Sequence, residues 1–107
     1  MRTHQEIDAR SLAMHRLVAD KLRREPDLLD KAVRTLGRWR ATASPSVQSY
    51  LEEWEQILSR GLDATIAVLL EESERATALR QCSPFAGGLS SRERFSFLRE
   101  WKAAHAA

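Results

Sequence analysis

Residues 44–72, SPSVQSYLEEWEQILSRGLDATIAVLLEE, contain two apolar patterns of helical period on either side of one glycine. Along the first pattern, apolar residues recur at the spacing of one helix face: Val47, Leu51, Trp54 and Leu58. Gly61 stands where helices commonly end in a left-handed residue. The second pattern predicts a short helix that is largely buried through Ile66, Ala67, Leu69 and Leu70. Two consecutive helices are therefore expected, and the second is expected to be the most buried in the chain.

Two longer helices are predicted on the amino-terminal side of this stretch. Thr3 and Glu6 have the spacing of a capping box, in which each side chain accepts from the other residue's backbone N–H. An apolar stripe follows: Ile7, Ser11, Met14, Leu17, Val18 and Leu22. Pro26 ends this helix because proline disfavours helical geometry at the residue before it. Asp27 is the expected cap of the next helix, whose apolar face carries Leu28, Leu29, Ala32, Leu36 and Trp39.

On the carboxy-terminal side, a non-helical stretch separates two further helices. Ser73 is expected to cap the short helix ERATALRQ, which Ser83-Pro84 stops. Gly87-Gly88 gives the chain freedom to turn, and Ser90 and Glu93 form a second capping-box pattern. The last helix then runs through Phe95, Leu98 and Trp101. No alternating strand pattern interrupts these elements, so we expect an all-α fold, a single compact bundle of five or six helices over residues 1–107.

A leucine and a tryptophan occur three residues apart in three of the predicted helices. These pairs are Leu36-x-x-Trp39, Leu51-x-x-Trp54 and Leu98-x-x-Trp101, and each places both side chains on one helix face. Such residues either share a core or serve as aromatic anchors for a partner. A chain of this length buries only about 60–65% of its extended surface and needs large side chains inside. We therefore favour a shared core.

The residues give little support to catalysis. The glycines have no phosphate-loop spacing, and no HExxH or paired-cysteine metal motif occurs. His4 and Asp8 are one turn apart near the chain end and are expected to be exposed, and His15 has no nucleophile near it in sequence. Cys82 follows a helix, where the dipole raises a thiol pKa. We expect no enzyme, no cofactor and no metal site.

Charge is distributed unevenly along the chain, although the net charge is only +2. Residues 1–41 carry ten Lys/Arg against six Asp/Glu, residues 42–79 two against seven, and residues 80–107 five against two. An acidic middle packed beside basic ends is one explanation. The other is a nucleic-acid-binding surface on the second helix, formed by Lys31, Arg34, Arg38 and Arg40.

The stretch RQCSPFAGGLSSRER, residues 80–94, is apolar where connecting loops are normally polar. Its large apolar residues either fold back to close the bundle or present a docking site to another protein. The second alternative also accounts for the neighbouring cations. The candidate partner-binding residues are Arg80, Pro84, Phe85, Leu89, Arg92 and Arg94.

Residues 73–101, SERATALRQCSPFAGGLSSRERFSFLREW, resemble a segment of small, uncharacterised bacterial helical proteins, in which a Ser-Pro-Phe turn leads through glycine and leucine into an Arg-containing helix. In size and layout the chain also resembles small proteins encoded beside a larger effector such as a toxin. The resemblance implies an accessory, antitoxin-like member of a two-gene unit whose partner is the product of a neighbouring gene. Because Cys82 is the only cysteine, a reducing cytoplasm is the expected compartment. A homo-oligomer is also compatible with the sequence, and no membrane partner is expected.

Overall fold

The computed structural model describes residues 3–85 and 88–105, and within them the fold is all-α. Ala86 and Gly87, which belong to the predicted loop, lie outside the described residues. The expected all-α bundle is confirmed, at the upper end of the expected helix number. The helices are α1 (His4–Arg24), α2 (Leu28–Thr42), α3 (Pro45–Ser59), α4 (Leu62–Leu70), α5 (Glu74–Gln81) and α6 (Ser91–Ala104).

Local capping signals explain most of the helix starts. Thr3 with Glu6 and Ser90 with Glu93 form the two expected capping boxes, at the starts of α1 and α6. Ser73 caps α5 as expected, because its hydroxyl accepts from the Ala76 N–H at 3.1 Å. Asp27 occupies the N-cap position of α2 as expected, but it is in helical geometry and its side chain makes no capping bond.

A single turn connects α3 to α4 and depends on glycine. Gly61 has a φ of 100° and a ψ of −172°, so it lies on the positive-φ side as predicted, although in extended rather than left-handed helical geometry. Only glycine adopts this conformation without strain. The turn lets α4 fold back against α3, which brings the most apolar helix into the centre of the molecule.

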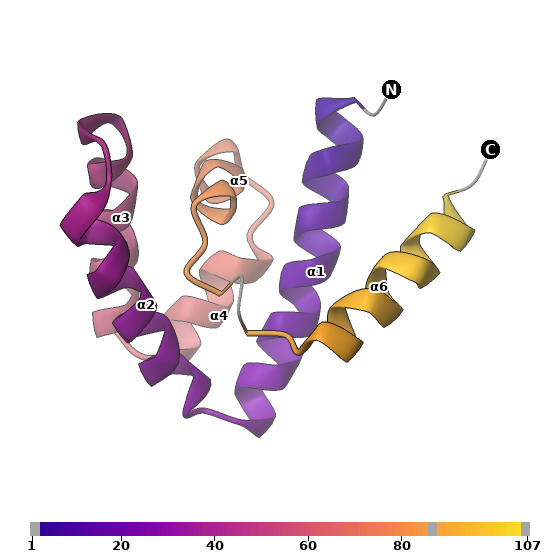
Figure 1. Cartoon of the computed structure of the whole chain (residues 1–107), viewed down its shortest axis with the longest axis horizontal. Coiled ribbons are helices and arrows are strands. Elements are labelled where there is room, and N and C mark those ends of the chain that lie inside the picture. Colours follow the sequence, from indigo (N-terminus) through magenta and orange to yellow (C-terminus); the bar gives the residue numbers. More distant parts are fainter. Residues whose placement is uncertain (1–2, 86–87, 106–107) are drawn as a thin grey trace.

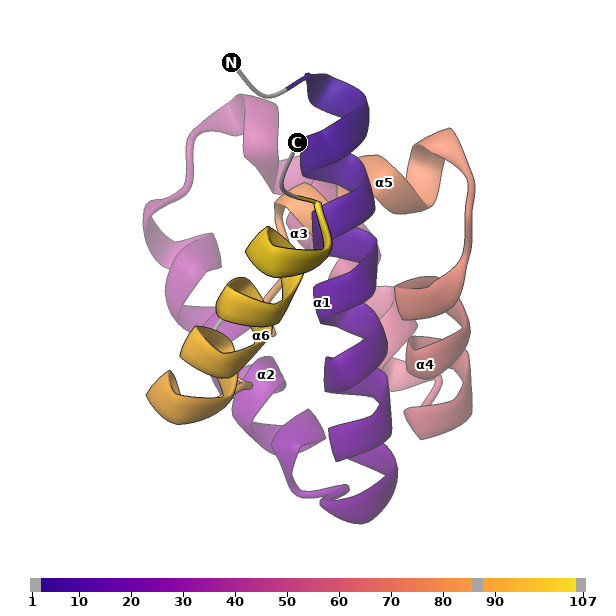
Figure 2. The ribbon, with the colours of Figure 1, turned by 90° about the vertical axis from the view of Figure 1, so that its right-hand side faces the viewer.

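Helices α1–α5 form the body of the molecule, and α6 is attached to one side of this body. α1 packs against α4 and α5, α2 pairs with α3, and α3 packs on α4. Figure 1 shows the α2–α3 pair on one side, α4 and α5 in the middle, and α1 on the other side. In the same view α6 diverges from α1 towards the C-terminus, and Figure 2 shows that it runs along the outside of the body.

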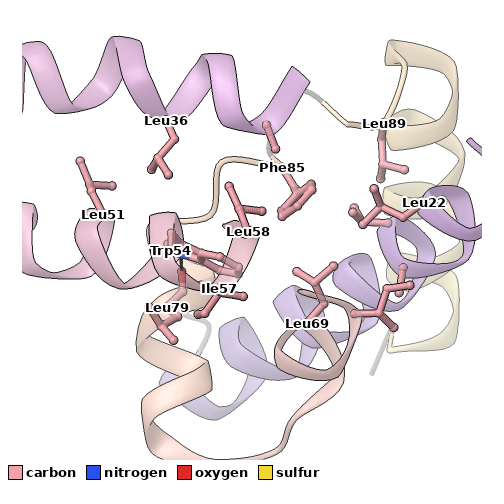
Figure 3. Close-up of a cluster of buried hydrophobic side chains, with 14 residues drawn as sticks. Leu22, Leu36, Leu51, Trp54, Ile57, Leu58, Leu69, Leu79, Phe85 and Leu89 are labelled. Carbon is pink, nitrogen blue, oxygen red and sulfur yellow. Dashed lines mark hydrogen bonds between the residues drawn. The ribbon is translucent and has the colours of Figure 1, made fainter. Parts of the chain in front are cut away.

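Trp54 is the centre of the core. Its side chain is completely buried, its Nε1–H donates to the Leu79 carbonyl oxygen at 2.8 Å, and Phe85 packs edge-on against it at 6.0 Å between ring centroids. Figure 3 shows Phe85 pointing into the cluster between Leu58 and Leu22. The shared core predicted for the Leu/Trp pairs is therefore confirmed for α3, and on α2 Leu36 is buried while Trp39 packs against the core from a half-buried position.

Candidate partner-binding surface

The apolar loop before α6 belongs to the core and is not a docking site. Phe85 and Leu89 are 3% and 7% exposed, and Pro84 is also buried. The Ser83 hydroxyl accepts from the Phe85 N–H at 3.1 Å, which turns the phenylalanine inward onto Trp54. Of the two alternatives that the sequence left open, the structure shows the closing of the bundle. The expectation that Pro84, Phe85 and Leu89 form an exposed anchor is not supported, because all three side chains are buried in this fold.

Arg80, another predicted partner-binding residue, is also buried. Its guanidinium donates to the carbonyl oxygens at the C-terminal end of α4: Glu71 at 2.7 Å, Val68 at 3.4 Å and Leu69 at 3.5 Å. The last carbonyls of a helix have no partner within it, and here the Glu71 N–H reaches only Val68, so a buried cation supplies the further donors. Burial lowers the pKa of Arg80, and the charge of Asp8 on α1 acts in the opposite direction. Arg80 is therefore a structural residue, and its assignment to a partner surface is corrected.

His15 lies in the same polar centre and is 3% exposed, whereas the sequence left it at the boundary of the apolar stripe. Its Nδ1 is 2.7 Å from the Ser11 carbonyl oxygen and donates to it. Burial lowers the pKa of His15, the bond to Ser11 raises it, and the nearby Arg80 lowers it again. Burial and the charge of Arg80 thus both favour the neutral form of the His15 imidazole.

The predicted cationic row on α2 is divided by the fold. Lys31, Arg34 and Arg38 lie within one exposed arc of the helix. Arg40 points to the opposite side, where it forms ion pairs with Glu55 at 2.5 Å and Glu52 at 3.4 Å on α3. The grouping of Arg40 with the other three is therefore wrong, because the acidic face of α3 neutralises it.

The last helix presents a different face from the one that its sequence pattern predicts. Phe97 is the buried aromatic residue of α6, whereas Phe95 is 66% exposed and Leu98 is 39% exposed. Trp101 is half-buried and stacks within its own helix on Phe97 and His105. The expected shared core thus lacks the Leu98/Trp101 pair. The exposed face opposite Phe97, named here the α6 outer face, consists of Arg92, Phe95, Leu98, Arg99 and Lys102. Arg92 and Lys102 stand at its edges and also line the clefts between α6 and α1.

Charge is segregated between the two sides of α6. Glu93 and Glu100, the acids of this helix, lie in the wall of a cleft of about 540 Å³ shared with α1. The α6 outer face carries cations and no acid, and the Arg99 guanidinium covers the Phe95 ring at 5.6 Å. No ion pair within residues 3–85 and 88–105 engages Arg92, Arg99 or Lys102. This surface combines uncompensated positive charge with exposed apolar side chains.

α6 is held to the body at its first turns. Lys21 of α1 donates to Glu93 at 2.5 Å, and Leu89 and Phe97 are buried beside this pair. Farther along, a cleft of about 710 Å³ opens between the first turns of α1 and the last turn of α6, where Trp101 forms part of the wall. The helix is therefore fixed at one end and extends away from the core at the other.

We expect Glu93→Gln to weaken this attachment and to remove a pH dependence. The bonds from Lys21 and from Ser90 lower the pKa of Glu93 to about 2. Because the folded pKa lies below the unfolded value, the stabilisation is complete above about pH 4.5 and is lost as the pH falls towards 2. Glutamine keeps the capping-box contacts but not the charge. An NMR titration of the Trp101 indole N–H should show this acid transition in the wild type and not in the variant, and an identical transition in both would contradict the assignment.

The remaining reactive side chains of the described residues are a cysteine and scattered potential metal ligands. Burial raises the pKa of the Cys82 thiol, the direction that the sequence predicted from the helix dipole. Within residues 3–85 and 88–105 no group of three or more His, Cys, Asp or Glu is placed to hold a metal ion. The helices described are all too short or too polar to cross a bilayer.

Sequence reasoning identified Arg92 and Arg94 as exposed cations but missed Phe95, Arg99 and Lys102. One signal in the sequence could have identified them. The acids of this helix, at positions 93 and 100, lie on the same side as Phe97, so the charged residues of the other side are all basic. Comparisons with protein-family models, with curated proteins and with solved structures find no match to this chain.

Proposed function

We propose that this chain is a small accessory protein that acts by binding another protein, and that the α6 outer face is its docking surface. The observation that supports the proposal is a helix that leaves the body with two large apolar residues exposed between unpaired cations. Phenylalanine and arginine are enriched in the cores of protein interfaces, and arginine is also enriched among the residues that contribute most to binding energy. The partner is expected to offer an apolar pocket for Phe95 surrounded by acidic side chains.

The regulatory role belongs to the same proposal. An antitoxin-like or regulatory member of a two-gene unit needs a binding surface and no catalytic centre, and the partner would be the product of a neighbouring gene. A reducing cytoplasm is the compartment that we propose, because the lone Cys82 has no cysteine to pair with in this chain.

The proposal predicts which substitutions abolish partner capture. Each adjacent gene product is co-expressed with the tagged chain, and capture is compared for the wild type, Phe95→Asp and Val33→Asp. Val33 is 49% exposed on α2 and serves as a matched control. We expect Phe95→Asp to weaken binding to the captured protein by about 30-fold to 1,000-fold, since an anchor residue contributes about 2–4 kcal/mol. Equal capture by the wild type and Phe95→Asp, with the fold intact by circular dichroism, would contradict the α6 docking site.

Nucleic-acid binding is the competing function, and it would use Lys31, Arg34 and Arg38. Their common exposed arc favours it. Against it, Arg40 is neutralised by α3, and Asp27 is exposed one turn from Lys31. The capture experiment separates the two functions: retention that disappears after nuclease treatment and weakens steeply with salt would identify nucleic acid instead of a protein partner.

A further inference from the structure

A cleft between α1 and α5 has the opposite character to the α6 outer face. It encloses about 460 Å³, a volume typical of small binding sites, and its apolar lining comes from Ala9, Leu12 and Ala78. Three acids line it, Asp8 on α1, Glu72 just before α5 and Glu74 at the start of α5. They outnumber the one cation of the lining, the buried Arg80, whose charge Asp8 and Glu72 partly offset. Glu72 and Glu74 are exposed, and no ion pair within the described part of the chain engages either of them.

The two surfaces are opposite in net charge. The α6 outer face has an exposed phenylalanine between cations, whereas the α1/α5 cleft combines a few apolar side chains with polar ones and has more acids than cations. Arg92, Phe95 and Arg99 follow one another at spacings of three and four residues and so form one stripe along the helix. Docking this stripe would bury the Phe95 ring and pair charges that are unpaired in the single chain.

We propose that the α6 outer face of one copy docks into the acidic α1/α5 cleft of a second copy. Phe95 enters the cleft over Leu12 and Ala78, and the cations on either side of it face Glu72 and Glu74. Each chain carries both surfaces, so the contact either closes reciprocally into a two-fold dimer or continues head to tail. The contact would bury about one helix face, and a buried area of that size is typical of weak interfaces. Association is therefore concentration-dependent and weakened by salt.

This inference uses the docking surface of the proposed function, and the second copy competes with the protein partner for it. Self-association would cover Phe95 until a partner with higher affinity displaces the second copy. One experiment can contradict either proposal without contradicting the other. Substitutions in the α1/α5 cleft abolish self-association but do not change the α6 outer face, so partner capture by such a variant tests the proposed function alone.

The experiment uses purified chains in sedimentation velocity at low salt over a wide concentration range. The wild type should show a mass that rises with concentration, and Arg99→Glu should weaken association by about tenfold, the effect of losing roughly 1.4 kcal/mol. Arg60→Glu makes the same charge change at an exposed position at the end of α3 and should leave the association unchanged. Circular dichroism verifies that each variant is folded.

Complementary variants give the decisive result. A chain with Glu72→Lys and Glu74→Lys should not self-associate, because a basic helix then meets a basic cleft. Mixed with the Arg99→Glu chain it should form hetero-oligomers, since its unchanged α6 outer face meets the unchanged acidic cleft of the Arg99→Glu chain. A wild type that stays monomeric at every concentration, an Arg99→Glu variant that associates like the wild type, or a mixture that does not associate would each overturn the proposal.

Discussion

Phe85→Ala should destabilise the folded chain by about 3–5 kcal/mol, whereas Phe95→Ala should change its stability by less than about 0.5 kcal/mol. The two phenylalanines are ten positions apart in the sequence but occupy opposite environments, 3% against 66% exposed. Removing the Phe85 ring leaves a cavity against Trp54, whose edge-on partner it is. A small domain is stable by about 5–15 kcal/mol in total, so the loss is a large fraction of that stability.

Chemical denaturation of both variants, monitored by tryptophan fluorescence and by far-ultraviolet circular dichroism, measures this difference. The unfolding free energy should fall with denaturant concentration at the same slope as in the wild type, but the midpoint of unfolding should lie at a lower concentration. That result would show a loss of stability without a change in the denatured state. A Phe85→Ala variant as stable as Phe95→Ala would mean that the loop does not close the core. In that case the docking role that the sequence left open for Phe85 would return.

Local signals in the sequence predicted most helix starts, and non-local contacts decided what the sequence left open. The capping boxes at Thr3 and Ser90 depend on residues three positions away, so they can be read directly. The position of Phe85 depends on Trp54, thirty-one positions earlier in the chain. Neither the composition of the loop nor its turn signals predict that contact, and the sequence therefore allowed two alternatives.

The assignment of the buried face of α6 shows a second limit. Phe95, Leu98 and Trp101 have helical spacing, but Phe97 and Trp101 have it too, so periodicity alone allows two faces. The Lys21–Glu93 ion pair and the burial of Leu89 orient the helix towards α1 on its Phe97 side. This choice turns Phe95 outward, and the candidate docking surface follows from it. The docking residues were thus missed for the same reason that the buried face was misassigned.

Arg80 gives the second large effect, because its guanidinium replaces the hydrogen-bond partners that the end of α4 lacks. We expect Arg80→Met to destabilise the fold by about 2–4 kcal/mol. Methionine fills similar space but leaves the carbonyl oxygens of Val68, Leu69 and Glu71 without the donor that they share. Arg80→Lys should give an intermediate loss, since an ammonium group is a point donor and does not reproduce the planar fork.

Arg75→Met is the matched control on the same helix. Arg75 pairs with Glu53 at the surface, and exposed ion pairs contribute only about 0–1 kcal/mol. Hydrogen exchange adds a readout of position: in Arg80→Met the amides of α4 and α5 should exchange faster than those of the α2–α3 pair, because Arg80 joins α5 to the end of α4. Equal stability of the Arg80→Met and Arg75→Met variants would contradict the structural role of Arg80. It would also restore Arg80 as a residue free to act at a surface, and with it the partner site predicted around residues 80–94.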